Sequence, residues 1–585
     1  MYNPRLNELY KDREIISCFK GYENNKVIDE NAFSFTENTG CISYPALSPR
    51  NKRVFFNVTG DNLQGLFSKE CIAYINNGSL YYGGEKATDL FFPDIDEERK
   101  FVSMGAYLII FPDKVYVNTE DLSDYGYLEA EFESNAQVTL GMCRADGELY
   151  GDYAISSVPP EKPLNGDLWL DTSSTPHTLK QFYETVNFWQ EIATTYVRIN
   201  CANIGKNFNQ YDGVLLSGFE NTDLDGAHVI RHKGDDFIVI TGIIDNALTI
   251  DTVVRVQRKV PDMDFVCEYG NRIWGCSSKN NEIYASKLGD PKNFNSFMGI
   301  SMDSYAVSVG SDGPFTAAVG YRGYILFFKE NCVHKIYGQN PPYTVVTSYI
   351  RGVQKGSHRS VVCLNETLYY KSVGGVCAYE GGVPISVSSA LGDTYYSKAV
   401  AGGCFSKYYI CMSDKNEQRH LFVYDEDKAL WHREDNIDIR EFSNNNCNLY
   451  FIMNQDGSRR MGLMDGENRY GSFTGELKGF CEEDDFNWTF ESGLWGLGLP
   501  ENKYYSNVSL RATGTKGARL SVYFEFDSSG KWVKQIDRVF DKTGSLHLPF
   551  ITPRCDHLRI KIQGRGDVKI YSISRKIESG SELNV

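Results

Sequence analysis

The sequence lacks an excess of positive charge. Its 60 Lys and Arg residues are outnumbered by 76 Asp and Glu, which gives a formal charge of −16. Proteins that bind nucleic acids neutralise the phosphate backbone with clustered Lys and Arg. The charge balance therefore argues against a nucleic-acid-binding surface.

Long apolar runs are missing as well. The longest, around Tyr107-Leu-Ile-Ile-Phe, is only one strand long, whereas a membrane-spanning helix needs about 20 apolar residues. The N-terminus, Met1-Tyr-Asn-Pro-Arg-Leu-Asn-Glu, has no apolar core of the kind found in secretory signals. We therefore expect a soluble protein, made in a cytosol, with no membrane-spanning segment.

Paired cysteines are absent, because the 15 Cys residues are dispersed without any Cys-x-x-Cys motif. Zinc and redox sites use such pairs, and an odd number of cysteines argues against a disulfide framework. Most lie in apolar runs, where a thiol behaves as a small hydrophobic side chain. We expect burial for Cys71, Cys276, Cys332, Cys363 and Cys411.

Motifs for phosphate binding, nucleophilic catalysis and metal binding are also missing. No Gly-x-x-x-x-Gly-Lys-Ser/Thr loop occurs, and Gly83-Gly-Glu-Lys is typical of a hairpin turn. The helix that follows a Gly-x-Ser-x-Gly nucleophile is not indicated. Thr222-Asp-Leu-Asp-Gly matches a calcium loop only in part. The nine His residues are isolated, and His432 is expected to be a polar residue at a strand end.

Acid-rich stretches are the remaining catalytic candidates, because propeller glycosidases place two carboxylates beside a sugar. However, Asp-rich turns before a Trp are typical of hairpin corners, where the carboxylate accepts backbone N–H groups. A sialidase also needs an Arg cluster, and the Arg residues here are scattered along the sequence. We therefore predict no catalytic residues, no cofactor, no metal ligands, and a protein that is not an enzyme. The stretches considered are Asp94–Glu98, Asp235–Asp236, Asp425–Asp427, Glu482–Asp485 and Asp527 before Trp532.

What the sequence does contain is a repeat. A turn of Gly, Asn, Ser or Lys leads into a short run of apolar and aromatic residues, and the repeats begin at Tyr269, Tyr321, Leu364, Phe405 and Asn445. Their spacing of about 40–52 residues is that of a four-stranded propeller blade. Aromatics make up 14% of the chain, which suits pleated, half-buried sheets. The repeat predicts positions in blade cores or between blades for Tyr324, Ile325, Phe327, Tyr369, Tyr409, Ile410 and Phe451.

The chain divides where this repeat starts and stops. We predict an all-β protein: a β-propeller of six or seven blades with an inserted β-domain and a C-terminal β-sandwich. The segments of alternating apolar and polar residues that predict the sandwich include Leu558-Arg-Ile-Lys-Ile and Leu546–Phe550. The predicted regions are an N-terminal extended segment with a ring-closing strand (1–60), propeller (61–125), insert (126–255), propeller (256–475) and sandwich (476–585).

Several stretches resemble the tail stabilisation proteins of bacteriophages and, more distantly, the propeller-bearing nozzle and tail-accessory proteins of short-tailed phages. The similarity covers about 260–585, the first 120 residues only loosely, and the insert least. It is carried by Asn271-Arg-Ile-Trp-Gly-Cys, Ile283-Tyr-Ala-Ser-Lys-Leu-Gly-Asp-Pro-Lys-Asn-Phe, Val307-Ser-Val-Gly-Ser-Asp-Gly-Pro-Phe-Thr, Phe327-Phe-Lys-Glu-Asn-Cys-Val-His-Lys, Arg351-Gly-Val-Gln-Lys-Gly-Ser, Phe422-Val-Tyr-Asp, Trp431-His-Arg-Glu-Asp, Pro553-Arg-Cys-Asp-His-Leu-Arg and Gly566-Asp-Val-Lys-Ile-Tyr-Ser-Ile-Ser.

The resemblance implies a structural virion protein of the phage tail, synthesised in the bacterial host cytoplasm. It implies a homo-oligomeric ring, expected to be a hexamer, that contacts other tail or adaptor proteins and possible tail fibres, with DNA only passing through its channel. It brings no catalytic residues. We expect deletion of 480–585 to leave a foldable propeller that fails to enter virions.

Two alternatives remain open. A receptor- or glycan-binding tail protein is favoured if Trp495 or Trp532 is exposed on the C-terminal domain, and burial of both counts against it. A propeller glycosidase requires two or three acids that converge at the centre of the disc.

Overall fold

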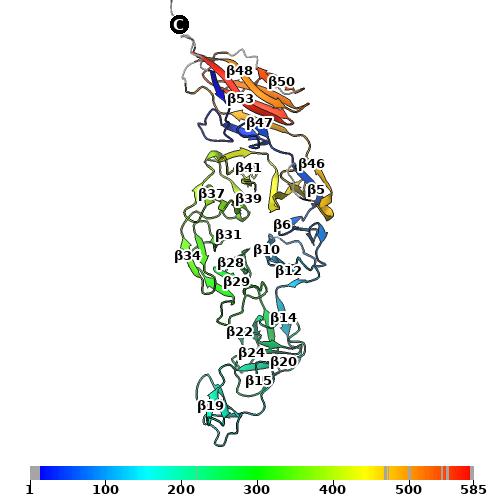
Figure 1. Cartoon of the computed structure of the whole chain (residues 1–585), viewed down its shortest axis with the longest axis vertical. Helices are drawn as coiled ribbons and strands as arrows, with labels where there is room; N and C mark the ends of the chain where they lie inside the picture. Colours follow the sequence, from blue (N-terminus) through cyan, green and yellow to red (C-terminus); the bar gives the residue numbers. More distant parts are fainter. Residues whose placement is uncertain are drawn as a thin grey trace, which may run out of the picture. The chain divides into compact units, whose positions relative to one another are not determined.

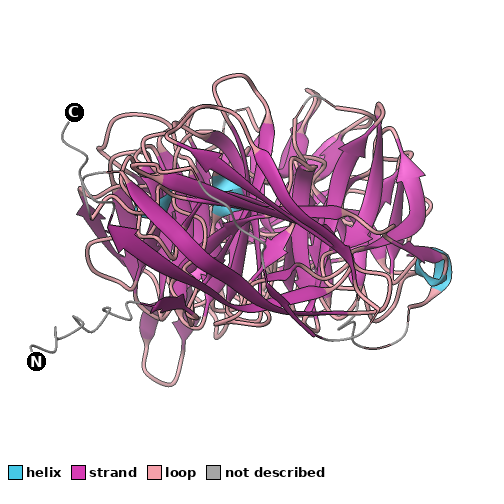
Figure 2. Ribbon diagram, turned by 90° about the horizontal axis from the view of Figure 1, so that it is seen from above, coloured by secondary structure: helices cyan, strands magenta, loops and turns pink. Residues whose placement is uncertain are grey.

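The computed structural model describes residues 13–579, apart from 96, 221, 467–470, 472, 499–501, 542–543 and 548–552. The candidate acid Asp96 and the end of the predicted strand Leu546–Phe550 lie outside the described residues. Strands dominate (Figure 2), and the helices within the described ranges are three 3₁₀ turns: η1 (His358–Ser360), η2 (Ser389–Leu391) and η3 (Gly475–Lys478). The prediction of an all-β protein is confirmed. No helix in this described part is long and apolar enough to cross a membrane.

The chain forms two compact units. Unit 1 comprises Met1–Asp96, Phe328–Cys332 and Tyr349–Val585, and unit 2 comprises Glu97–Phe327 and Val333–Ser348. Both contain small antiparallel sheets whose strands follow one another in chain order, so that each sheet is a meander.

Unit 1 contains four of these sheets among its described residues (labels in Figure 1). The first consists of β6 (Gln64–Ser68), β7 (Ile72–Asn76), β8 (Ser79–Tyr82) and β9 (Glu85–Lys86). The second consists of β35 (Val362–Leu364), β36 (Thr367–Ser372), β37 (Gly375–Tyr379) and β38 (Ile385–Ser386). The third consists of β39 (Ser397–Cys404), β40 (Lys407–Ser413), β41 (Arg419–Asp425) and β42 (Leu430–Arg433). The fourth contains β43 (Asp438–Asn445), β44 (Asn448–Gln455) and β45 (Ser458–Leu463).

The fourth sheet also takes a strand from the N-terminal segment. β5 (Val54–Gly60) pairs with β45, with Gly60 opposite Arg459 and Val54 opposite Leu463. A further short strand, β46 (Phe480–Glu482), pairs with β5. Backbone hydrogen bonds therefore join the beginning of the chain to its last repeat.

Unit 2 contains three sheets of the same kind in its described part. The first consists of β10 (Lys100–Met104), β11 (Tyr107–Phe111), β12 (Val115–Asn118) and β13 (Tyr125–Tyr127). The second consists of β27 (Phe265–Glu268), β28 (Ile273–Ser277), β29 (Glu282–Ala285) and β30 (Tyr305–Ser308). The third consists of β31 (Ala317–Tyr321), β32 (Tyr324–Phe328), β33 (Val333–Tyr337) and β34 (Thr344–Ser348).

The repeated sequence motif marks the turn between the first two strands of a sheet. Both central residues of the β39–β40 turn have positive φ, 48° at Phe405 and 57° at Ser406. The β43–β44 turn is similar, with 49° at Asn446 and 64° at Cys447. Two-residue hairpin turns with positive φ match the twist of the flanking strands, which explains why the motif recurs.

The second strand of each repeat carries core residues. Ile325, Phe327, Tyr369, Ile410 and Phe451 are at most 4% exposed. Two predicted core residues, Tyr324 and Tyr409, are only half-buried. Tyr324 begins its strand. Tyr409 points to the opposite face from its neighbours in β40, because strand side chains alternate, and it packs there against a buried cluster that includes Cys411 and Phe451.

Between β13 and β27 the chain forms three further sheets in unit 2. The first consists of β14 (Ala130–Glu133), β26 (Arg255–Arg258), β21 (Gly213–Ser217) and β22 (Gly226–Val229). The second consists of β23 (His232–Lys233), β24 (Phe237–Thr241), β20 (Tyr196–Asn200), β15 (Val138–Cys143) and β25 (Leu248–Ile250). The third consists of β16 (Ala154–Ser156), β17 (Leu168–Asp171), β18 (Thr178–Tyr183) and β19 (Phe188–Glu191). Ala130 pairs with Arg258, so both ends of this segment lie side by side, and such a looped-out segment costs little entropy.

Nine of the remaining strands of unit 1 form two sheets that share one apolar core, including Trp488, Leu520 and Ile560. One sheet has the order β1 (Arg13–Ile16), β53 (Val568–Ser579), β48 (Lys503–Gly514), β51 (Gly544–His547). The other has the order β2 (Phe33–Glu37), β47 (Asn487–Ser492), β52 (Leu558–Arg565), β49 (Arg519–Phe526), β50 (Val533–Val539). Leu558 and Ile560 are buried whereas Arg559 and Lys561 are not, as their alternation predicted.

The N-terminal segment is part of this C-terminal region, which the sequence did not indicate. β1 pairs with β53 and β2 pairs with β47, and a short ladder of β3 (Thr39–Gly40) and β4 (Ser48–Pro49) connects β2 to β5. Deletion of 480–585 would leave β1 and β2 without partner strands. The expectation that this truncation leaves a foldable propeller stays a prediction, in which the segment from β1 to β2 loses its place in the C-terminal sheets.

Candidate functional site: a basic cleft

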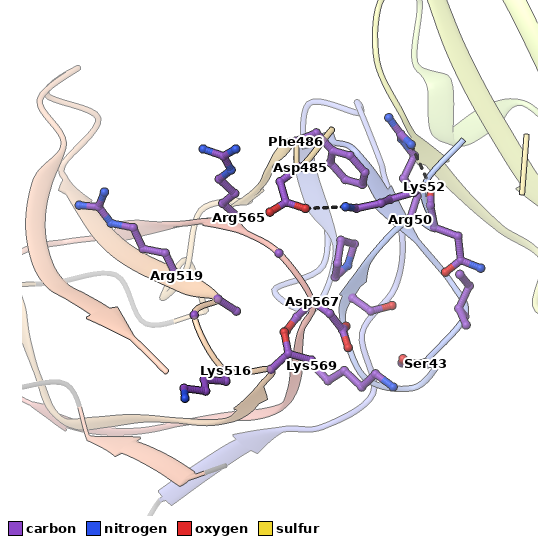
Figure 3. Close-up of a pocket in the computed structure, with 18 of the residues that line it drawn as sticks. Ser43, Arg50, Lys52, Asp485, Phe486, Lys516, Arg519, Arg565, Asp567 and Lys569 are labelled. Atoms are coloured by element: carbon purple, nitrogen blue, oxygen red, sulfur yellow. Dashed lines mark hydrogen bonds and ion pairs between the residues drawn. The ribbon is translucent and has the colours of Figure 1, made fainter. Parts of the chain in front are cut away.

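Cationic side chains line one cleft in unit 1 (Figure 3). The cleft has a volume of about 890 Å³ and lies among the segment before β5, the β46–β47 link and the β48–β49 and β52–β53 turns. The lining of this cleft carries more cationic than acidic side chains, although the whole chain has a formal charge of −16. Its cations are Arg50, Lys52, Lys516, Arg519, Arg565 and Lys569, and its carboxylates are Asp485 and Asp567.

Three of these cations have carboxylate partners. Arg50 lies 2.7 Å from Glu483, Lys52 lies 2.6 Å from Asp485, and Arg519 lies 2.6 Å from Asp537. The hydrogen bond from Lys52 lowers the pKa of Asp485 below its ordinary value, so this acid is ionised and its charge is matched.

The other three cations form no ion pair with any described residue: Lys516, Arg565 and Lys569. Lys516 and Arg565 are exposed, and Lys569 is half-buried. Arg565 also helps to lower the pKa of Asp485 through its charge. Cations gathered along a concave surface raise the local potential and attract anions. The cleft is therefore suited to an anionic ligand.

Hydrogen bonds hold the two turns that border the cleft together. The Thr515 backbone N–H and hydroxyl both donate to the Asp567 carbonyl, over 3.1 and 3.4 Å. The Trp488 indole donates to the Gly566 carbonyl over 2.9 Å. Gly566 has a φ of 80°, and a Cβ at this position would lie 3.3 Å from the Cβ of Ala518. Glycine therefore allows the two turns to approach closely.

A buried ionic cluster supports the opposite wall. The guanidinium of Arg53, 1% exposed as a side chain, lies 2.6 Å from Glu434 and 2.7 Å from Asp435. Burial by itself would lower the pKa of Arg53, but Asp435 and Glu434 raise it above its ordinary value. Arg50 and Glu483 complete the cluster. The cluster fixes Arg50 in place, so its side chain is a rigid part of the wall.

Three of the predicted acid candidates accept backbone hydrogen bonds within the fold. Asp425 accepts the Lys428 backbone N–H over 3.2 Å, and Asp527 accepts that of Asp556 over 2.8 Å. Asp236 accepts the Asn203 backbone N–H over 2.7 Å. The Asp425 contact is the one expected of a carboxylate at a hairpin corner, whereas Asp527 and Asp236 each join two segments that are distant in the sequence.

The candidate metal residues are also engaged in the fold. Asp225, from the partial calcium loop, accepts the Phe219 backbone N–H over 3.0 Å. His432 is 5% exposed, and its Nδ1 lies 3.3 Å from the thiol of Cys41. Burial lowers the pKa of His432 to about 3, so it is a neutral core residue rather than a polar strand end. Within the described ranges, no group of three or more His, Cys, Asp or Glu is arranged to hold a metal.

The cysteines and tryptophans differ partly from expectation. Cys276, Cys332 and Cys411 are buried, but Cys71 and Cys363 are exposed, because the first lies in a turn and the second on an outer strand. Trp495 is 2% exposed and belongs to the core. Trp532 is half-buried, with the Lys561 amino group 4.6 Å from its ring centre.

No protein-family model matches the chain, and no curated protein matches it. Among solved structures, it is similar to an exo-β-1,3-galactanase from Phanerochaete chrysosporium, with 11% identity, 52% of this chain and 93% of that chain covered, and a TM-score of 0.21. It is similar to Raptor from Chaetomium thermophilum, with 9% identity, coverage of 70% and 29%, and a TM-score of 0.27. It is also similar to the phage phi92 endosialidase, with 9% identity, coverage of 93% and 77%, and a TM-score of 0.21.

These matches correct one prediction from the sequence, namely that the protein is not an enzyme. The matched structures include glycoside hydrolases, so the proteins that this chain is similar to include enzymes. At such TM-scores the likeness assigns neither a reaction nor a catalytic residue to the chain.

The basic cleft was missed by the sequence analysis. Its cations come from segments that are far apart in the chain, and each stands alone or in a short turn such as Lys516-Gly-Ala-Arg. Arg50, Arg519 and Arg565 are scattered along the sequence but line the same cleft. The total charge of −16 concealed this local excess.

Proposed function

We propose that this protein is a structural virion protein of a bacteriophage tail. Copies form a ring, a hexamer in this proposal, that extends or stabilises the tail and its DNA channel. The resemblance of residues 260–585 to tail stabilisation proteins supports this role. The ring contacts other tail or adaptor proteins, and DNA only passes through it.

In this proposal the seven small sheets are the blades of one propeller, with a looped-out β-domain and a C-terminal β-sandwich. Their succession in chain order supports this arrangement, as does the pairing of β5 with β45. Propellers close by completing one blade with strands from both chain ends, which leaves no open edge. A closed disc of this kind is a stiff platform for assembly.

The observation that carries the assembly role is an apolar surface on the sheet of β16 to β19, which we call the tip surface. It consists of Leu164, Tyr183, Val186 and Phe188, which are 74%, 39%, 68% and 64% exposed. Tyr183 lies opposite Phe188 across the hairpin, and the Glu184 backbone N–H donates to Asn165 beside Leu164. Clustered exposed apolar side chains mark protein contacts.

We assign the tip surface to the contact with a neighbouring copy. A closed ring uses heterologous interfaces, in which one surface of a subunit meets a different surface of the next. An apolar surface that is covered in the assembly and exposed in the single chain fits such an interface.

The test is the double variant Val186→Ser, Phe188→Ser. It should fold normally, since both side chains are exposed, but self-association measured by analytical ultracentrifugation and incorporation into virions should be lost. The matched control is Val27→Ser, Val383→Ser, whose side chains are 77% and 78% exposed elsewhere. Unchanged assembly of the tip variant would refute the proposed interface.

A further inference from the structure

We propose that the basic cleft is a binding site for an acidic oligosaccharide, a sugar chain that carries carboxylate or sulfate groups. This ligand class follows from the chemistry of the lining and not from the ring proposed above. The site would exist in the single chain, because all of its lining residues belong to unit 1.

The unpaired cations predict the anionic part of the ligand. Lys516, Arg565 and Lys569 line the cleft without an ion pair to any described residue. Arg565 presents a planar set of donors that matches the two oxygens of a carboxylate or sulfate, whereas the lysines act as point charges. Separate cations along one cleft suit a ligand with several anionic groups.

Two acceptors in the same cleft predict hydroxyl groups on the ligand. The Asp567 carboxylate is exposed and forms no ion pair with a described residue. The Ser48 hydroxyl is buried, with 3% of the residue exposed, and has no hydrogen-bond partner in the described structure. A buried polar group without a partner costs free energy, so a ligand hydroxyl that reaches Ser48 would gain binding energy.

These hydrogen-bond acceptors favour an acidic sugar over a polyanion that has no hydroxyl groups. A carboxylate such as Asp567 repels a phosphate chain or a polyglutamate segment but accepts hydrogen bonds from sugar hydroxyls. Ile42 and Val539, 50% and 57% exposed, provide apolar surface at the cleft, which suits the C–H groups of a sugar ring. The cleft volume of about 890 Å³ is within the range of sites for small ligands, about 300–1,000 Å³.

The experiment measures binding of the full chain by isothermal titration calorimetry. The probes are defined hexasaccharides carrying uronate, sialate or sulfate groups, a neutral hexasaccharide, a hexaglutamate peptide and a single-stranded oligonucleotide. At least one acidic hexasaccharide should bind at least about tenfold more tightly than every other class, and its affinity should fall with added salt.

Variants then locate the site. Lys516→Gln, Arg565→Gln, Lys569→Gln should weaken binding by about a hundredfold, because several charge-assisted hydrogen bonds are lost together. The control Arg144→Gln, Arg255→Gln, Lys398→Gln removes the same charge from side chains that are 62%, 53% and 61% exposed. It should leave the affinity within about twofold of the original value.

Asp567→Ala distinguishes sugar recognition from attraction of any anion. Loss of a hydroxyl acceptor should weaken binding of the acidic hexasaccharide by about tenfold, whereas loss of a repulsive charge would strengthen binding of a plain anion. Tighter hexasaccharide binding in this variant would overturn the proposal. Equal or tighter binding of the peptide or the oligonucleotide would also overturn it, as would the absence of binding by every acidic hexasaccharide.

Discussion

The Arg50 guanidinium donates hydrogen bonds to both carboxylate oxygens of Glu483, over 2.7 and 2.8 Å. The Arg53 backbone N–H donates to the same carboxylate over 3.0 Å. Arg50 lies between β4 and β5, and Glu483 follows β46. The ion pair therefore joins the N-terminal segment to the start of the C-terminal sheets and shapes one wall of the basic cleft.

Loss of this pair should destabilise unit 1. Glu483→Gln leaves the Arg50 charge, 4% exposed as a side chain, without its bidentate partner, and breaking such a buried pair typically costs about 3–5 kcal/mol. Chemical denaturation should show a lower free energy of unfolding. Asp484→Asn is the matched control, because Asp484 is exposed, and its stability should stay within about 0.5 kcal/mol of the parent.

The same cluster should make the protein sensitive to acid. Burial would raise the pKa values of Glu483 and Asp435, but the hydrogen bonds and charges of Arg50 and Arg53 lower them below their ordinary 4.5 and 3.8. A group with a lowered folded-state pKa contributes stability above its unfolded-state pKa and loses it as the pH falls through the folded-state value. Burial raises the pKa of Glu434, which opposes part of this effect.

We therefore expect the thermal midpoint to fall as the pH drops below 4.5. The fall should be smaller in Glu483→Gln, which has no carboxyl to protonate at that position. Melting curves of both proteins between about pH 6 and pH 3 measure the difference. An equal or steeper fall in the variant would contradict the assigned role of Glu483.

The hairpin turns predict a stabilising substitution. Cys447 is exposed and has a φ of 64°, a conformation that costs a residue with a Cβ about 1–2 kcal/mol and glycine almost nothing. Cys447→Gly should raise the free energy of unfolding by up to about 1 kcal/mol. Cys447→Val should lower it, because a β-branched side chain tolerates positive φ poorly. Denaturation curves measure both free energies of unfolding. A lower value for Cys447→Gly than for Cys447→Val would mean that this turn is assigned wrongly.

A buried lysine predicts a second pH effect. Lys371 is 2% exposed, and its amino group donates to Gln354 and to the Ser372 carbonyl. Burial lowers its pKa to about 8 from 10.5. The unfolded chain then binds this proton more tightly, so stability should rise with pH between these values.

Lys371→Met removes that dependence. Between about pH 8 and pH 10 the parent should gain thermal stability relative to the variant. The difference between the two melting midpoints at each pH isolates this lysine from other titrating groups. A difference that does not change with pH would show that Lys371 keeps its ordinary pKa in the folded protein.

The sequence was most informative where the structure is local. Strand alternation and turn residues predicted the all-β class, and the motif around Phe405 and Asn445 marks hairpin turns with positive φ. Such features depend on a few neighbouring residues, so they can be recognised in one chain.

Features that depend on distant contacts could not be predicted. β1 and β2 are short, and their partners β53 and β47 lie at the other end of the chain. The cleft needs cations from separate segments, including Lys52, Lys516 and Lys569. No period or motif connects these positions, because the three-dimensional fold alone brings them together.

Electron cryomicroscopy of phage particles that encode this chain, with an affinity label fused to it, tests the central claim most directly. The proposed function predicts a closed ring of copies in the tail, with the label at a fixed position around the axis of the DNA channel. Purified, infectious particles that lack the chain would contradict the account, as would a tail reconstruction in which it forms no ring.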